Sequence, residues 1–304
     1  MEIPKFEDIQ VSTRTTIVIG NIDLDIRKLF EFLPITDYIV VQKKRGRKKK
    51  SVTIDQNKNI KDGSIITLEY QNEIKGVRLK KKKNSTIKKG EDFFRNALTT
   101  VMIMDSKKIN FKITRNGKFQ MTGCRTEEQA EGCVKRIWEL IKDQDFYKFH
   151  KGEEYFTALF IPAMRNIDFD IGFRIDRTKL DQFINHSTDY RSLLEPNIGY
   201  TGVNIKIPYK DSKPITTLTL KKLLYKNEIW KFKEHIPYTD YLNLLSEKDK
   251  TKQLNKKRNH TFLVFHSGKI IMSSICAEFA REPYYEFMKI LKQNQNDFKE
   301  KLIE

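Results

Sequence analysis

The chain has 304 residues, of which 38% are hydrophobic and 11% aromatic, so intrinsic disorder is not expected and two domains can form. Its 58 lysines and arginines exceed its 40 aspartates and glutamates, which gives a net charge of +18. This excess attracts polyanions and leaves DNA, RNA and an anionic membrane surface as candidate partners.

Three cysteines, Cys124, Cys133 and Cys276, are too few and too scattered for a disulfide scaffold, which favours a reducing compartment. The first residues lack a secretion signal, and no apolar run approaches the ~18 residues of a membrane-spanning helix. Neither metal-ligand spacing nor a glycine-rich phosphate loop is found. We therefore expect a soluble, intracellular protein with no metal and no cofactor.

The first half of the chain predicts the order strand, helix, several strands, helix. Residues 11–20 are rich in β-branched side chains, and Leu24–Leu33 has the pattern of a short helix. Ser64–Leu79 and Phe111–Gly123 alternate around turn residues, as β-hairpins do. Thr126–Lys142 has apolar residues at helical spacing and a threonine at its start that can cap a helix.

The second half predicts the same order. Residues 160–173 favour a strand, and Ile175–Ile184 favours a short helix. Val203–Leu220 has the alternation of a hairpin, and so has Phe262–Ser274. Ala277–Gln293 then predicts an amphipathic helix, with Tyr284, Phe287, Met288 and Leu291 as its apolar stripe.

One shift of about 151 positions relates the two halves. It pairs Gly117 with Gly268 in the hairpins, and Asp25 with Asp176 at the short helices. A single shift that fits both ends of each half indicates an internal duplication.

We therefore expect a first repeat at residues 1–148 and a second repeat at residues 149–304. Residues 43–97 and 209–259 are expected to contain insertions, which include the charged runs Lys43–Lys50, Lys80–Lys89 and Glu247–Arg258. Such runs are usually solvated loops, although on a DNA-binding protein they add affinity for phosphates.

The two hairpins also carry a family resemblance. NGKFQMTGCRTEEQ (Asn116–Gln129) and SGKIIMSS (Ser267–Ser274) resemble the repeat hairpins of the TATA-box-binding-protein superfamily. The length and the basic insertions resemble the divergent members encoded by nucleocytoplasmic large DNA viruses, the giant-virus type.

This resemblance implies an α+β fold in which two pseudo-symmetric repeats form one curved antiparallel sheet, a saddle with helices on its convex face. It implies a viral transcription-initiation factor that binds and bends DNA through the minor groove. The implied partners are double-stranded DNA with an AT-rich promoter, a transcription factor IIB-like protein and a multisubunit RNA polymerase. No catalysis is implied.

The resemblance also places DNA contacts on the concave face. In the second repeat these are two kinking aromatics, a base-contacting hydroxyl, two apolar residues and two lysines near phosphates, which correspond to Phe265, Tyr200, Ser273, Val264, Ile271, Lys206 and Lys269. Residues three apart on a strand face opposite sides, so Phe262 is expected in the core if Phe265 faces DNA.

The first repeat matches the family less well. Thr122 keeps the hydroxyl and Lys118 keeps the charge, but Thr114 stands where the family has the aromatic residue. Unequal engagement of DNA by the two repeats, or a different promoter sequence, follows from this departure.

Two alternatives remain from the sequence. Asp168 and Asp170 alternate along one strand, as paired metal ligands of a nucleic-acid-processing enzyme can, although acids at strand ends and helix caps have the same pattern. The weak first repeat also fits a scaffold that recruits transcription proteins without binding DNA.

Overall fold

The computed structural model describes residues 3–39, 60–78, 96–194 and 202–300. The chain divides into two compact units. The N-terminal unit comprises Thr16–Ile161 and Lys222–Lys233, and the C-terminal unit comprises Met1–Thr15, Pro162–Lys221 and Glu234–Glu304. Strands β1 (Val11–Gly20) and β9 (Phe156–Asp170) contribute residues to both units.

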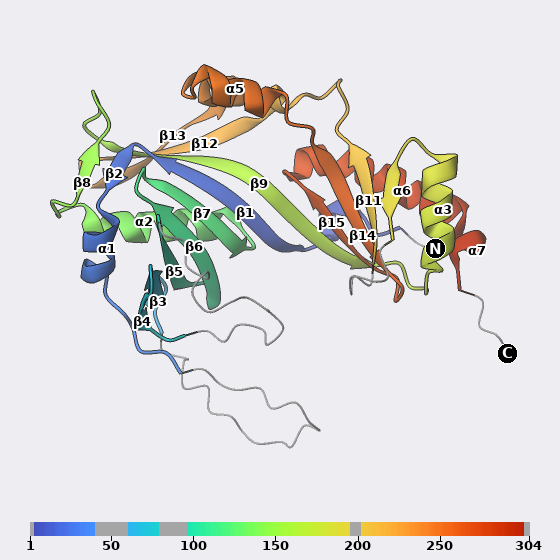
Figure 1. Cartoon of the computed structure of the whole chain (residues 1–304), viewed down its shortest axis with the longest axis horizontal. Coiled ribbons are helices and arrows are strands. Elements are labelled where there is room, and N and C mark those ends of the chain that lie inside the picture. Colours follow the sequence, from blue (N-terminus) through green and yellow to red (C-terminus); the bar gives the residue numbers. More distant parts are fainter. Residues whose placement is uncertain (1–2, 40–59, 79–95, 195–201, 301–304) are drawn as a thin grey trace. The chain divides into compact units, whose positions relative to one another are not determined.

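The N-terminal unit is built on a sheet in the order β1-β7-β6-β5-β3-β4, whose strands from β7 to β4 pair antiparallel (Figure 1). These strands are β3 (Ile65–Tyr70), β4 (Glu73–Gly76), β5 (Ala97–Met104), β6 (Lys107–Thr114) and β7 (Lys118–Cys124). The unit also contains α1 (Ile26–Phe32), α2 (Glu127–Ile141) and a small sheet of β2 (Ile22–Leu24) with β8 (Tyr147–Phe149).

Helix α2 forms as the sequence predicts. The Oγ1 atom of Thr126 accepts a hydrogen bond from the Gln129 N–H, and two glutamates occupy the first turn. The helix buries residues at helical spacing, which are Ala130, Val134, Ile137, Trp138 and Ile141. They pack on the inner residues of β6 and β7 and form the core of the unit.

The C-terminal unit contains a sheet in the order β10-β11-β14-β15-β9-β1. The pairings from β10 to β9 are antiparallel. Its further strands are β10 (Arg191–Leu193), β11 (Gly202–Pro208), β14 (Asn259–Phe265) and β15 (Lys269–Ser274). Its helices are α3 (Arg177–Ser187), α4 (Tyr238–Asn243), α5 (Glu247–Leu254), α6 (Ala277–Gln293) and α7 (Gln295–Phe298), together with the short turns η1 (Phe6–Asp8) and η3 (Ile215–Thr217).

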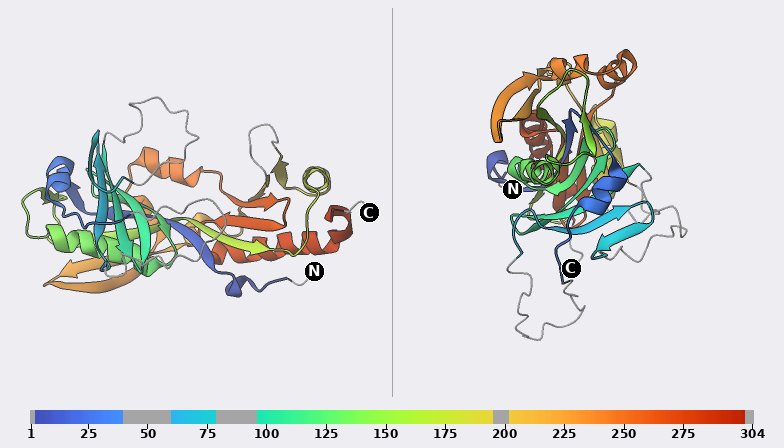
Figure 2. Two further views of the ribbon diagram at one scale, coloured as in Figure 1. Left: turned by 90° about the horizontal axis from the view of Figure 1, so that it is seen from below. Right: turned by 90° about the vertical axis from the view of Figure 1, so that its left-hand side faces the viewer.

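Helix α6 covers one face of this sheet, as Figure 2 shows. The predicted stripe of Tyr284, Phe287, Met288 and Leu291 is fully buried. The ring of Phe287 lies 4.2 Å from the ring of Phe262, centroid to centroid. One face of the sheet therefore packs against α6 in the core. Because side chains alternate along a strand, the other face points away from this helix.

The short helices begin at the two aspartates that the shift pairs. The Asp25 side chain accepts from the N–H groups of Arg27 and Lys28. The Asp176 side chain accepts from the N–H groups of Thr178 and Lys179 in the same way. The predictions of both short helices are confirmed, with starts two residues later than expected.

The prediction of a hairpin at Val203–Leu220 is wrong. Strand β11 pairs with β10 and β14, whereas β12 (Thr219–Lys226) pairs with β13 (Ile229–Pro237) and β9. Leu223 and Tyr225 of β12 belong to the core of the N-terminal unit. Burial of these two side chains favours the pairing of β12 with β13 and β9. Local alternation of residue types does not reveal which strand is the partner.

The prediction of a loop at Glu247–Arg258 also requires correction. Residues Glu247–Leu254 form α5, whose N–H at Asp249 donates to the Ser246 Oγ atom. The basic runs Lys43–Lys50 and Lys80–Lys89 lie outside the described residues. None of the described helices combines the length and apolar character that crossing a bilayer requires.

Candidate nucleic-acid interface

The face of the C-terminal sheet that points away from α6 is termed the C-terminal open face. Because side chains alternate along a strand, residues beside the buried Phe262 and Val264 must point to it. It presents Thr261, Leu263 and Phe265 from β14, all partly exposed. The expectation that Phe262 and Phe265 face opposite sides is confirmed.

Strand register aligns this face into rows across four strands. One row runs Lys206, Thr261, Ser273, Asn166, and the next runs Asn204, Leu263, Ile271, Asp168. Directly opposite residues on an antiparallel pair share a face. The register therefore brings Lys206, Ser273 and Ile271, three of the residues singled out by the sequence, onto one surface.

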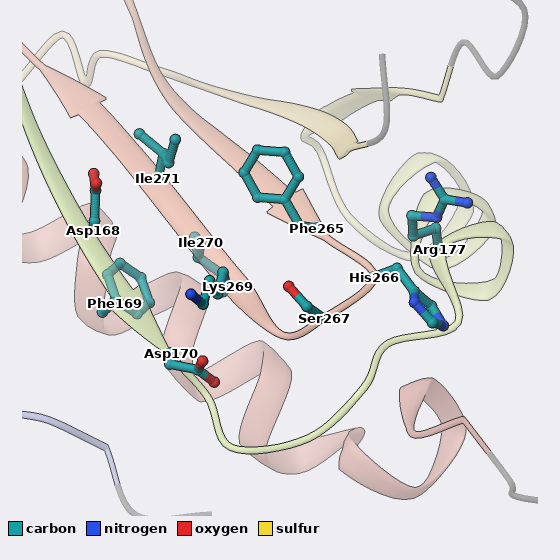
Figure 3. Close-up of a pocket in the computed structure, with 10 residues that line it drawn as sticks. All are labelled: Asp168, Phe169, Asp170, Arg177, Phe265, His266, Ser267, Lys269, Ile270 and Ile271. Atoms are coloured by element: carbon teal, nitrogen blue, oxygen red, sulfur yellow. The ribbon is translucent and has the colours of Figure 1, made fainter. Parts of the chain in front are cut away.

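Phe265 lies at the end of β14, beside the turn that leads to Lys269. It lines a hollow of about 1040 Å³ together with Ile271, Lys269 and Asp168. Figure 3 shows Phe265, Ile271 and Asp168 projecting from three neighbouring strands toward the same side. The hollow thus combines an aromatic ring, a branched aliphatic chain and charges of both signs.

Val264 does not belong to this surface. Its side chain is fully buried in the core beneath α6, and its partner across the ladder, Ile270, is buried with it. Adjacent residues of a strand face opposite sides, so Val264 and Phe265 cannot both contact the same ligand. The assignment of Val264 as a DNA contact is wrong.

Tyr200, the second expected kinking aromatic, lies outside the described residues. The register also places Leu263, Asn166 and Asn204 on the C-terminal open face, and none of the three is among the DNA contacts expected from the resemblance. The two-residue period counted from Phe265 is the signal that identifies Leu263.

Two acids also lie on this face. Asp168 and Asp170 are exposed, and Asp168 accepts a 2.8 Å hydrogen bond from the Ser12 hydroxyl. Asp170 accepts from the Gly172 N–H. The described part of the chain holds no group of three or more His, Cys, Asp or Glu side chains arranged for a metal ion. Among the described residues, the two carboxylates therefore have hydrogen-bond partners, and no third His, Cys, Asp or Glu side chain forms a metal-binding group with them.

The corresponding surface of the N-terminal unit, termed the N-terminal open face, is more polar. Register aligns Thr122 with Asn110, and Gln120 with Lys112, across β6 and β7. Burial lowers the pKa of the Lys112 ammonium group, as expected for a cation that is partly removed from water. This face therefore offers amides, hydroxyls and a lysine where the C-terminal open face offers Leu263, Phe265 and Ile271.

Neighbouring residues limit the extent of the N-terminal open face. Tyr38 and Ile60 pack on Ile66, Val101 and Ile103, which covers the surface over β5 and β3. The accessible part is consequently centred on β6 and β7.

The predicted contacts of the first repeat lie around the β6–β7 turn. Thr122 is exposed, and its hydroxyl donates to the Asn110 carbonyl oxygen. Thr114 is partly exposed, and its hydroxyl bonds within the turn to the Asn116 side chain and the Lys118 carbonyl oxygen. A short threonine held within a turn cannot supply the flat apolar surface of an aromatic residue.

No family model matches the sequence. The chain is 27% identical over 219 residues to the uncharacterized protein 335L of Invertebrate iridescent virus 6, a match that covers 69% of this chain. It spans 64% of the length of that relative. The viral source of this relative agrees with the viral origin expected from the sequence.

The structure is similar to that of Methanococcus jannaschii TBP, with a TM-score of 0.44 and 14% sequence identity. This similarity covers 95% of the chain described here and 99% of that protein.

Proposed function

We propose that the chain binds double-stranded DNA through its open faces, in the minor groove, and acts in transcription initiation as a TATA-box-binding-like factor. The observation that supports this most directly is the C-terminal open face. It is a sheet surface, and on it partly exposed Leu263, Phe265 and Ile271 stand beside the exposed Lys206 and Lys269.

The minor groove suits such a surface. It presents few distinguishing hydrogen-bond donors, so proteins read it through shape, deformability and apolar contact. Apolar side chains that enter between base pairs unstack them and bend the duplex, while lysines neutralise phosphates. Phe265 supplies the apolar wedge, Ser273 supplies a hydroxyl for a base edge, and Lys206 and Lys269 supply the charge.

Two asparagines on the C-terminal open face add to the argument. In the part of the chain that the structure describes, the buried Oδ1 atoms of Asn166 and Asn204 have no hydrogen-bond partner. Unsatisfied buried polar atoms are costly and uncommon. Since A·T pairs present only acceptors in the minor groove, the amide Nδ2 groups of these asparagines, which donate, are the atoms suited to them. Both residues lie in the registered rows that include Ser273 and Ile271.

The unequal faces favour unequal roles for the two units. The C-terminal open face has the side chains for prying base pairs apart, whereas the N-terminal open face has Thr122, Gln120 and Lys112 for polar contacts. We therefore propose one principal kink, made by Phe265. The saddle formed by two repeats, the AT-rich promoter, the transcription factor IIB-like protein and the multisubunit RNA polymerase are parts of the same proposal, drawn from the family resemblance.

A binding titration tests this function. The full chain is titrated against AT-rich and GC-rich duplexes of equal length at about 50 mM and about 200 mM salt, with bending followed by energy transfer between dyes at the duplex ends. We expect tighter binding and stronger bending of the AT-rich duplex, with affinity falling steeply as salt rises. Absence of binding at the lower salt concentration rejects the proposal and favours the scaffold.

The same duplexes separate a binding protein from an enzyme. Incubated with the chain and Mg²⁺, they are expected to stay intact. Cleavage that is lost in Asp170→Asn contradicts a non-catalytic role.

A further inference from the structure

A second hollow of about 830 Å³ lies at the edge of the C-terminal unit, away from Phe265. It lies between the outer end of the β10–β11 pair, the segment after β11 and the chain that follows α5. Seven of its lining residues are basic, namely Arg191, Lys206, Lys210, Lys213, Lys256, Lys257 and Arg258, against two acids, Asp189 and Asp211. The insertion and the sheet edge therefore form a basic surface together.

Some of these cations are already neutralised. Lys210 forms ion pairs with Glu282 and Glu286 of α6 at 2.7 and 2.6 Å, and Lys213 pairs with Glu278 at 3.1 Å. These contacts fix the segment after β11 against α6. They also remove Lys210 and Lys213 from the charge available to a ligand.

Other cations of the hollow are available. Arg191, Lys206, Lys256 and Lys257 are exposed, and within the described part of the chain their charged side-chain groups form no hydrogen bond or ion pair. Four such cations around one hollow create a positive potential that attracts an anion carrying several charges.

The chain that presents Lys256 and Lys257 is held in place. The Arg258 guanidinium donates to the carbonyl oxygens of Gln253 at 2.9 Å and Lys256 at 3.1 Å. The Tyr209 N–H donates to the Arg258 carbonyl oxygen at 3.1 Å. The segment that contains the two lysines is therefore hydrogen-bonded to the chain at the end of β11. This restraint lowers the conformational entropy that the segment loses when it binds a ligand.

Lys206 connects this hollow with the C-terminal open face. It lines the hollow, and it also begins the row that continues through Thr261, Ser273 and Asn166. Arg191 pairs with Lys206 across β10 and β11, so it extends the same row outward. A duplex bound to the C-terminal open face would therefore meet positive charge at the β10–β11 edge of the sheet.

We propose that this hollow, termed the basic edge, binds the phosphate backbone of the same duplex DNA, with Lys256 and Lys257 supplied by the insertion. This inference rests on the proposed function and assigns a role to the insertion. Contacts to phosphates carry no sequence information, so the basic edge adds affinity and salt dependence without changing sequence preference.

The test compares two double variants that remove the same charge from the same insertion. Lys256→Gln/Lys257→Gln alters the basic edge. Lys248→Gln/Lys252→Gln alters exposed lysines of α5 that do not line it. Affinity of the full chain for AT-rich and GC-rich duplexes is measured at several salt concentrations.

We expect the first variant to reduce the magnitude of the slope of log affinity against log salt by about two, one unit for each lost phosphate contact. Its affinity for the AT-rich and the GC-rich duplex should fall by a similar factor. The control should keep the slope of the unmodified chain. If the unmodified chain binds DNA and the two variants have equal slopes, the inference is overturned and the proposed function is not. Failure of the unmodified chain to bind either duplex rejects the proposed function itself.

Discussion

The main chain at Gly268 lies so close to Phe173 that a Cβ atom on Gly268 would come within 2.2 Å of the Phe173 carbonyl oxygen. Gly117 has the same relation to Ile22, at 2.3 Å. Both glycines have positive φ, 85° and 64°. Each unit thus seats its hairpin turn against the chain that leads into its short helix, and the 151-residue shift relates the two pairs.

Gly268→Ala should therefore destabilise the C-terminal unit by about 3 kcal/mol, because left-handed backbone disfavours a Cβ atom and the carbonyl oxygen occupies its place. Denaturant unfolding measures the loss. Gly172→Ala is the matched control, since Gly172 has φ 79° but nothing within 4 Å of an added Cβ atom. Its expected cost is about 1 kcal/mol, and equal costs for the two variants contradict the close contact.

The two phenylalanines of β14 should separate binding from stability. Phe265→Ala is expected to weaken DNA binding about tenfold or more and to remove most of the bending, because the apolar wedge is lost. Its effect on unfolding should be small, since the ring is partly exposed.

Phe262→Ala is the companion variant. Its fully buried ring packs on Phe287, so the expected cost is about 3–5 kcal/mol of unfolding free energy. Titration and denaturant unfolding are measured on both variants. Unchanged DNA binding by Phe265→Ala removes Phe265 from the interface.

Asp168 places a negative charge on a surface proposed to meet a polyanion. Asp168→Asn should tighten binding about threefold to tenfold at low salt, since it removes repulsion while an amide still accepts from Ser12. The gain should shrink as salt rises. Glu228→Gln, at the exposed turn of the β12–β13 hairpin, is the control and should leave affinity unchanged. Weaker binding by Asp168→Asn would instead indicate a direct role for the carboxylate.

His260 should make stability depend on pH. It is 3% exposed, its ring stacks on Tyr209, and Nδ1 lies 2.9 Å from the Ser274 Oγ atom. Burial lowers its pKa to about 4. In the unfolded chain this histidine has a pKa of about 6.5, so the unfolded chain takes up the proton at a higher pH than the folded chain does. The free energy of unfolding should therefore fall as pH drops from about 6.5 to about 4, and it should level off at lower pH.

The expected loss between about pH 7 and about pH 5 is roughly 2 kcal/mol. His260→Gln should flatten this part of the profile in urea unfolding. His266→Gln is the control, because the His266 side chain is 44% exposed and pairs with Glu300 at the surface. A profile that keeps its slope in His260→Gln assigns the pH dependence to other groups.

The sequence alone determined the features that depend on local chemistry. Period-two alternation separated Phe262 from Phe265, and helical spacing identified the buried stripe of α6. The capping of α2 followed from the preference of a threonine hydroxyl for free N–H groups at a helix start. The excess of lysine and arginine already pointed to a polyanion as partner.

The tertiary structure decided what depends on residues far apart in the chain. Only strand register shows that Asn166 and Asn204, on two other strands, share the surface of Leu263 and Ile271. Packing of Tyr225 into the N-terminal unit, and the placement of Lys206 and Lys256 around one hollow, likewise have no local signal. Burial and strand pairing depend on contacts between distant segments, so no local window of the sequence contains them.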